Sequence, residues 1–293
     1  MSRALEDPGC FRLMGVVNVT PDSFSDGGLF LDSHAAIAHA RELVGEGADI
    51  VDVGGESTRP GAEPVSGEEE LRRVLGVVEG IAATGADAQV SIDTSKASVA
   101  RACLEAGATL VNDVTALRGD PDMAGLVADS GAECCLMHMR GEPRTMQADP
   151  RYDDVVDDVR AFLEERMAYA VAQGVREESI MLDPGIGFGK TLAHNLALLR
   201  RLDELASLGR PLVVGTSRKS FIGRVLADAA GHTEPAAVAE RLPGTIATNV
   251  LAYERGASVF RVHDVAPVRA ALALAAATLS ARWDPGETRT PTS

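Results

Sequence analysis

The chain has 293 residues, which is enough for one large α/β barrel or for two ordinary domains. Its apolar fraction of 45% supports a full hydrophobic core, and its net charge of -15 argues against nucleic acid or an anionic membrane as the main partner. No segment is long and apolar enough to span a bilayer, and the first residues lack the apolar core of a signal peptide. We therefore expect a cytoplasmic protein whose cysteines are reduced thiols.

Eight short apolar runs recur along the chain, and a stretch with helical periodicity follows each of them. The runs comprise residues 13–19, 50–53, 89–92, 109–111, 134–137, 180–182, 212–214 and 258–260. Eight βα units in about this length predict a single (β/α)8 TIM barrel, an α/β fold whose strands all end at one rim. A doubly wound open sheet is the alternative, but neither end of the chain offers a short, charged edge strand.

The barrel is expected to span residues 13–280, between an N-terminal extension at 1–12 and a disordered Pro/Thr-rich tail at 281–293. Its seventh unit is long. A polar segment near 232–241 and a second helix from about 244 to 254 predict an extra helical segment there.

The seventh run leads directly into Gly215-Thr216-Ser217-Arg218-Lys219, a small-residue turn that ends in two cations. Cations at the carboxyl end of a buried parallel strand suit ligand binding in an α/β enzyme. A solvated basic turn explains this stretch equally well when it is taken alone.

Other strand ends carry two further kinds of polar group. Amides and carboxylates suit the N–H edge of a flat nitrogen heterocycle, although a strand-end aspartate is also often a helix cap: Asp93, Asn112 and Asp183. Cations suit an oxyanion: Arg59, Lys219, Arg261 and His263. Both sets, with Asn18, are expected to meet at one barrel mouth, with the carboxylates at its floor and the positive charge nearer the entrance.

Several motifs fail on spacing. The segment 185–191 ends like a phosphate-binding P-loop but has one residue too few between its outer glycines. The turn at Gly215 begins like a nucleophile elbow but lacks the last glycine, and no histidine or cysteine pair has zinc spacing. We therefore expect positioning and charge stabilisation without a nucleophilic side chain, and we expect His138 to be structural.

Taken together, the strand-end loops resemble those of dihydropteroate synthase. The matching segments are residues 18–28, 54–61, 183–190, 217–220 and 261–264, and the similarity covers about residues 13–279. This family joins a hydroxymethyl-dihydropterin diphosphate to p-aminobenzoate in folate synthesis, releases diphosphate and requires Mg2+. Its members are typically homodimers.

The resemblance implies a role for each matching residue. The pterin diphosphate would be held by Thr58, Asp93, Asn112, Met137, Asp183, Phe188, Gly215, Lys219, Arg261, Val262 and His263. The p-aminobenzoate site, where sulfonamides compete, would be bordered by Phe24, Arg59, Pro60, Phe188, Ser217, Arg218 and Ser220. Asn18 would ligate Mg2+. Lys219, Arg261 and His263 would act in catalysis together with Asp26, whose carboxylate would stabilise a cation-like pterin methylene.

Two other functions are alternatives to a dihydropteroate synthase. A pterin-binding methyltetrahydrofolate methyltransferase would need the amide and carboxylate set but not the cations. A non-catalytic paralogue would tolerate losses in the first two loops and in Ser217-Arg218-Lys219, which are intact here. Resistant enzymes carry an insertion near the second loop, and its absence between Ser57 and Val65 predicts ordinary sulfonamide sensitivity.

Overall fold

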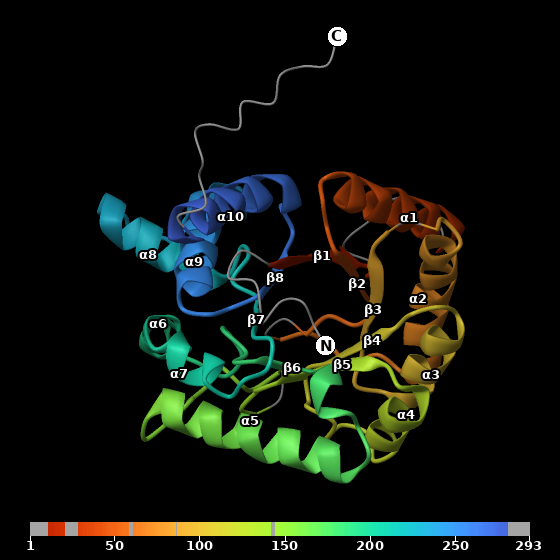
Figure 1. The fold of residues 1–293 in the computed structure, drawn as a ribbon. Coiled ribbons are helices and arrows are strands. Elements are labelled where there is room, and N and C mark those ends of the chain that lie inside the picture. The colour runs from red at the N-terminus through yellow and green to blue at the C-terminus, as the bar shows by residue number, and fades with distance from the viewer. Residues whose placement is uncertain (1–10, 21–28, 59–60, 86, 142–143, 281–293) are drawn as a thin grey trace.

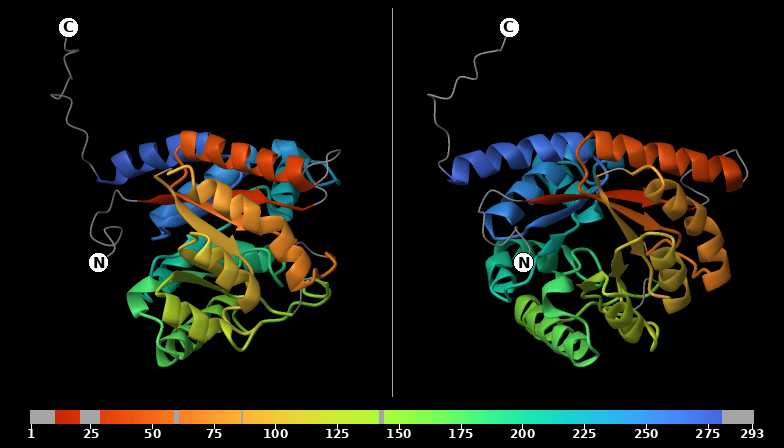
Figure 2. Two further views of the ribbon diagram at one scale, coloured as in Figure 1. Left: turned by 90° about the vertical axis from the view of Figure 1, so that its right-hand side faces the viewer. Right: turned by 45° about the vertical axis from the view of Figure 1, so that its right-hand side comes forward.

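The computed structural model describes residues 11–20, 29–58, 61–85, 87–141 and 144–280, except for the side chains of 29–32. Eight parallel strands form one sheet in the order β6-β5-β4-β3-β2-β1-β8-β7. A parallel bridge between Leu182 and Leu212 joins the two ends of this order. The helices lie around the strands in Figure 1, and the same layering is visible in the two views of Figure 2. The predicted TIM barrel is therefore confirmed.

The strands are β1 (Arg12–Asn18), β2 (Ile50–Gly54), β3 (Gln89–Asp93), β4 (Leu110–Asp113), β5 (Glu133–Met137), β6 (Ile180–Asp183), β7 (Val213–Val214) and β8 (Val259–Val262). The first helices are α1 (Leu29–Gly45), α2 (Gly67–Ala82), α3 (Ala97–Glu105), α4 (Met123–Ser130) and α5 (Val155–Ala172). The later ones are α6 (Leu192–Arg200), α7 (Leu202–Ala206), α8 (Ser220–Ala230), α9 (Leu242–Glu254) and α10 (Val265–Ser280), with 3-10 turns η2 (Glu177–Ser179) and η3 (Val238–Glu240). The chain between β7 and β8 thus contains α8, η3 and α9.

Strand side chains alternate between two environments. Outward residues such as Val51, Val53 and Leu136 pack in the large core between strands and helices. Inward residues form a separate apolar floor made of Met14, Ile50, Leu110, Cys135, Met181, Val213 and Val259. Because side chains two apart in a strand point the same way, the residues two positions further along form the next layer. That layer is polar, since it contains Asp52, Asn112, Asp183 and Arg261.

The last strand is longer than the apolar run that predicted it. β8 continues to Val262 because it pairs with β1 through Arg261 and Val262, opposite Met14 and Gly15. Arg261 is therefore a strand residue with an inward side chain, one residue beyond the apolar run 258–260.

Three cysteines, Cys103, Cys134 and Cys135, are buried free thiols, and the last two face opposite sides of β5. In the parts of the chain that the structure describes, no helix is long and apolar enough to cross a membrane. Residues 1–10, Cys10 among them, and the predicted tail at 281–293 lie outside the described residues.

Candidate active site at the barrel mouth

The centre of the barrel mouth is built around one arginine. Arg261 on β8 donates from Nε to an oxygen of Asp52 at 2.7 Å and from Nη2 to an oxygen of Asp93 at 2.7 Å. Asp52 lies on β2 and Asp93 ends β3, so the guanidinium ties three strands together. Asp93 and Arg261 meet as expected. The arginine, however, lies among the carboxylates and not nearer the entrance, because its strand extends further than the apolar run.

Asp52 is the member of this set that the sequence did not single out. Its side chain is fully buried. Ser91 Oγ donates to one of its oxygens at 2.6 Å, whereas Asn112 Nδ2, at 3.0 Å, and Arg261 Nε share the other. The available signal was a lone carboxylate inside the apolar run 50–53, two residues after Ile50 and hence on the same strand face.

Two carboxylates therefore share one guanidinium, and together they carry more negative charge than it neutralises. Burial raises the pKa of Asp93 to about 7, with Arg261 opposing the rise and the charge of Asp52 adding to it. Burial alone would lower the pKa of Arg261, but Asp52 and Asp93 hold it above its usual value. Arg261 is thus charged at any physiological pH, while Asp93 titrates near neutrality.

A second group lies where β6 and β7 end. The Lys219 ammonium donates to the carbonyl of Ile186 and stands 4.6 Å from the centre of the Phe188 ring. Burial lowers the pKa of Lys219 to about 8, with Asp183 opposing the fall. Burial likewise raises the pKa of Asp183, against Lys219 and the backbone N–H of Gly185, which donates to its carboxylate at 2.6 Å. Asp183 and Lys219 therefore interact electrostatically, each opposing the shift that burial imposes on the other.

A buried lysine fixes the loop after β6 to the loop after β5. Lys190 Nζ lies 2.9 Å from His138 Nδ1 and donates to the carbonyl of Phe188 at 3.1 Å. Burial lowers the pKa of Lys190 well below its usual value, with Asp183 opposing the fall. Burial also lowers the pKa of His138 to about 2, and Lys190 adds to that fall. His138 is thus a neutral structural residue, as expected.

Two glycines allow these loops to approach each other. Gly185 and Gly189 have φ angles of +65° and +63°, a conformation that L side chains rarely adopt. A Cβ at Gly185 would overlap the carbonyl oxygen of His138, and one at Gly189 would overlap that of Arg140. The glycines of the P-loop-like segment therefore serve loop packing, and they place Phe188 beside Lys219.

His263 and the turn after β7 form the outer part of the mouth. Ser217 Oγ lies 3.0 Å from His263 Nδ1 and accepts the backbone N–H of His263 at 3.2 Å. Arg218 makes a two-pronged ion pair with Asp264, at 3.0 Å from Nε and 2.6 Å from Nη2. Its φ of 58° is supported by Thr245, whose hydroxyl accepts the Arg218 backbone N–H at 3.1 Å. The sequence did not predict this ion pair between Arg218 and Asp264.

The other predicted residues are distributed around this centre. Asn18 pairs with Gly54, which in turn pairs with Asp93, so these three strand ends lie side by side. Met137 is buried and packs in a cluster against which Phe188 is placed. The side chain of Val262 lies in the outer core, so that its backbone alone faces the mouth.

Thr58 is half-buried, Gly215 adjoins Arg261, and Ser220 begins α8 with an exposed side chain. Phe24, Asp26, Arg59 and Pro60 lie outside the described residues.

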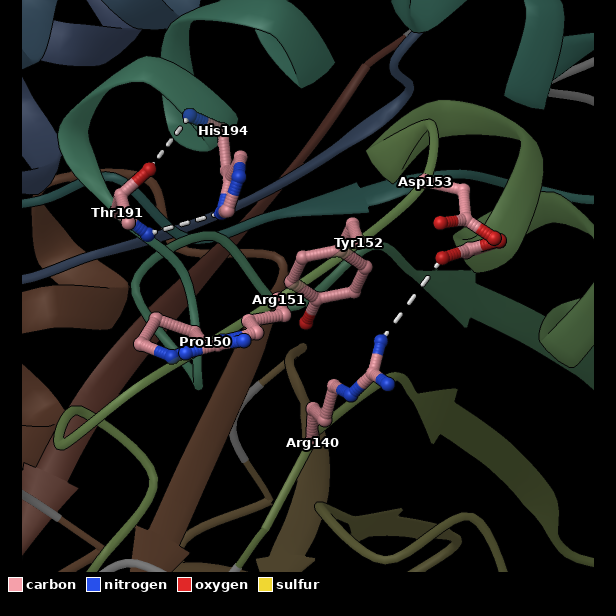
Figure 3. Close-up of a pocket in the computed structure, with 8 residues that line it drawn as sticks. Arg140, Pro150, Arg151, Tyr152, Asp153, Thr191 and His194 are labelled. Atoms are coloured by element: carbon pink, nitrogen blue, oxygen red, sulfur yellow. Dashed lines mark hydrogen bonds and ion pairs between the residues drawn. The ribbon is translucent and has the colours of Figure 1, made fainter.

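A separate hollow of about 500 Å3 opens between the segments that follow β5 and β6 (Figure 3). It is lined by Arg140, Pro150, Arg151, Tyr152, Asp153, Asp158, Thr191 and His194. Arg140 covers the Tyr152 ring at 4.8 Å and pairs with Asp158 at 3.8 Å, so its charge is already engaged. None of the predicted substrate-binding residues that the structure describes lines this hollow, and the candidate site is therefore the barrel mouth.

Comparisons with known proteins identify the family. The family model described as "Pterin binding enzyme" matches residues 14–263. Dihydropteroate synthase from Escherichia coli (strain K12) is 46% identical over 271 residues, or 92% of this chain and 93% of that protein. The structure of Xanthomonas albilineans dihydropteroate synthase with 4-aminobenzoic acid has a TM-score of 0.85 and 45% identity, covering 94% of both chains.

A further structure, Yersinia pestis dihydropteroate synthase in a sulfonamide drug complex, has a TM-score of 0.85 and 44% identity, covering 94% of this chain and 96% of its own. Identity at this level over nearly the whole chain, together with the shared barrel, decides the family. The chain belongs to the pterin binding enzyme family, among its dihydropteroate synthases.

Proposed function

We propose that this chain condenses (7,8-dihydropterin-6-yl)methyl diphosphate with 4-aminobenzoate to give 7,8-dihydropteroate and diphosphate. The polar layer at the barrel mouth carries the proposal. In that layer Asp93, Asn112 and Arg261 belong to one hydrogen-bonded network through Asp52. Asp183 and Lys219 adjoin it, since Asp183 acts electrostatically on both Lys219 and Arg261. The relatives' names and the bound 4-aminobenzoic acid support this choice of substrates.

The pterin ring would lie on this layer. Carboxylates such as Asp93 and Asp183 accept the N–H groups of an amino-pyrimidine edge, and the amide of Asn112 can both donate and accept. Lys219 would donate to a ring acceptor. Phe188 stands 4.6 Å from the Lys219 ammonium and belongs to the cluster around Met137, so it offers a flat apolar wall. Gly215 carries no side chain beside Arg261, and the backbone of Val262 would complete this side of the pterin site.

The reaction breaks the C–O bond between the pterin methylene and the diphosphate, and the electron pair leaves with the diphosphate. The amine nitrogen of 4-aminobenzoate forms the new C–N bond and loses a proton. Charge grows on the leaving group, so Arg261 and His263, with the hydroxyl of Thr58, would stabilise it. Ser217 orients the His263 ring, since its hydroxyl lies 3.0 Å from Nδ1. Asp26 would stabilise the cation-like methylene.

Mg2+ would supply further positive charge to the diphosphate when bound. It prefers oxygen ligands, keeps several waters and commonly binds through one or two protein oxygens and substrate phosphates. Asn18 offers one half-buried amide at the end of β1. Among the residues that the structure describes, no group of three His, Cys, Asp or Glu side chains could hold a metal alone, which fits an ion shared with the diphosphate.

The 4-aminobenzoate would approach over the turn after β7. Ser217, Arg218, Ser220 and Phe188 would border it there. By resemblance to the family, Phe24, Arg59 and Pro60, which lie outside the described residues, would also belong to this site. A sulfonamide would compete for the same place, as the sulfonamide complex of the related enzyme supports. We expect its inhibition constant to be comparable with the KM for 4-aminobenzoate, and a constant far above that KM would contradict ordinary sensitivity.

The enzyme would act in the cytoplasm as a homodimer. Leu274 and Leu279 on α10 are 71% and 54% exposed, and Leu251 on α9 is 45% exposed. Large apolar side chains on neighbouring helices are typical of association surfaces. Analytical ultracentrifugation measures the mass directly, and a single monomeric species at micromolar concentration would contradict the dimer.

The decisive assay measures diphosphate and dihydropteroate together, with Mg2+, in the presence and absence of 4-aminobenzoate. We expect the two products to appear in equal amounts when both substrates are present. A methyltetrahydrofolate methyltransferase would form no dihydropteroate, and a non-catalytic paralogue would bind the pterin without releasing diphosphate. Arg261→Met should abolish turnover, and Arg201→Met is its control, because Arg201 also bridges carboxylates away from the mouth. Its partners are Asp154 at 2.6 Å, Asp157 at 3.3 Å and Glu204 at 2.7 Å, between α5 and α7. Arg201→Met should leave turnover unchanged.

A further inference from the structure

Two contacts hold Arg261 at the mouth, and substrate binding can affect them differently. Its Nε donates to Asp52 and its Nη2 donates to Asp93, each at 2.7 Å. In the proposed function Asp93 accepts from the pterin, and Arg261 faces the diphosphate. Asp93 would then accept from both the pterin and Nη2 of Arg261, so the ligand competes for a carboxylate that Nη2 already contacts. The Asp93 contact is therefore the one of the two that the pterin can replace.

The two carboxylates differ in how firmly the protein holds them. Asp52 is fully buried, and its oxygens accept bonds from Ser91, Asn112 and Arg261. The side chain of Asp93 is 11% exposed, and in the described part of the chain its hydrogen-bonding side-chain partner is Arg261. Asp52 thus has no free acceptor position that a ligand could reach, whereas Asp93 is accessible from the mouth.

Glycine backbones leave the space around the exchangeable contact open. Gly54 lies beside Asp93 on β2, and a Cβ there would stand 3.6 Å from the Asp93 carboxylate oxygen. Gly215 lies in the turn after β7. A Cβ there would stand 3.7 Å from the Cβ of Arg261 on β8. Neither position therefore carries a side chain that would cover Asp93 or Arg261.

We propose that Asp52 is a positioning residue, which keeps Arg261 at the barrel centre through Nε while a bound pterin displaces Nη2 from Asp93. The inference rests on the proposed function. Nε of Arg261 then keeps its contact with Asp52, whereas Nη2 exchanges its contact. The N–H groups of Nη2 turn to the diphosphate only when the pterin ring is bound. Asp52 acts through Arg261 and does not itself touch the substrate.

Without the negative charge of Asp52, Arg261 should pair more tightly with Asp93 and so compete with the pterin for that carboxylate. In Asp52→Asn, Asp93 becomes the remaining carboxylate partner of the guanidinium, so the pterin must compete against an undivided ion pair. One charge-assisted hydrogen bond corresponds to about a 10- to 100-fold change in an equilibrium constant. We expect the Kd of a diphosphate-free 6-hydroxymethyl-7,8-dihydropterin to rise by about this factor.

The double variant Asp52→Asn/Arg261→Met separates this idea from a structural role. It removes the competing guanidinium, so the Kd of the same dihydropterin should return to within about threefold of the unaltered protein, although turnover stays lost. Calorimetry provides both constants, and the melting temperature of each variant verifies its fold. A double variant that binds the dihydropterin as weakly as Asp52→Asn, or an Asp52→Asn variant with unchanged affinity, would overturn the proposal.

A second measurement does not depend on the folding of any Asp52 variant. In the unaltered protein, the arginine Nε–H signal of Arg261 is assigned in nitrogen-proton NMR spectra by its loss in Arg261→Lys. Addition of the dihydropterin should leave this Nε–H protected from exchange with water, while the Nη signals of Arg261 shift. Loss of Nε–H protection on binding would show that Asp52 releases the guanidinium. The proposed function fails separately, if the unaltered protein binds the dihydropterin but forms no dihydropteroate.

Discussion

Pterin affinity should depend on pH through one carboxylate. Asp93 is the accessible acceptor of the mouth, and burial raises its pKa to about 7. A protonated Asp93 cannot accept two N–H bonds from an amino-pyrimidine edge. The affinity for a dihydropterin should therefore rise about tenfold per pH unit up to about pH 7 and level off above it. At pH 6 the unliganded protein would hold Asp93 mostly protonated, and at pH 8 mostly ionised.

The assay is calorimetric titration of 6-hydroxymethyl-7,8-dihydropterin between pH 5.5 and 8. Asp93→Asn is the matched control, because it keeps the shape of the side chain but cannot ionise. It should bind more weakly than the unaltered protein at pH 8 and lose the tenfold change per unit between pH 5.5 and 7. Affinity that stays flat in the unaltered protein, or that falls as the pH rises, would refute the reasoning.

The raised pKa of Asp93 has the opposite effect on folding stability, which decreases as the pH rises. The pKa of Asp93 is raised on folding from its ordinary 3.8, so between 3.8 and about 7 the native state binds more protons than the unfolded state. The contribution of Asp93 to the free energy of unfolding is therefore greatest below 3.8 and decreases as the pH rises through this window. Substrate affinity and stability thus change in opposite directions with the ionisation of one group.

Three substitutions test the framework that holds the mouth, each by denaturant unfolding. Lys190→Met should lower the free energy of unfolding by about 1–3 kcal/mol, because it leaves buried acceptors near His138 unpaired; an unchanged midpoint would contradict the loop clamp. Gly185→Ala should lower the free energy of unfolding by about 1–3 kcal/mol, because alanine is strained at a φ of +65°, and it should also raise the KM for the pterin substrate. A variant with a normal KM would show that the loops adjust without changing the site. Lys96→Met should cost about 3–5 kcal/mol, since it leaves the fully buried Glu70 without its cation, at 2.5 Å in the native protein; a loss below 1 kcal/mol would contradict that pairing.

Local patterns in the sequence were enough to predict the barrel. Apolar runs at eight places define strands, and their shared rim brings Asp93 and Arg261 together over a separation of 168 residues. Strand parity places Arg261 on the inward face, two residues after Val259 of the apolar floor.

The partners of the polar residues were not predictable in the same way. Asp52 looked like an interruption of an apolar run, and its importance depends on the register that sets it opposite Ser91 on β3. Lys190 resembled the end of a P-loop, yet its ammonium contacts His138 on a loop 52 residues earlier. Such contacts depend on how the loops pack after the barrel has formed, and that packing has no local signature in the sequence.

The central claim is that polar groups from distant strands form one pterin site at the barrel mouth. A crystal structure of the chain with 6-hydroxymethyl-7,8-dihydropterin tests it most directly. We expect the amino-pyrimidine edge within hydrogen-bond distance of Asp93 or Asp183, with Arg261 still bonded to Asp52 through Nε. Density for the ligand in the hollow beside Arg140 and Tyr152, with the mouth unchanged, would contradict the account.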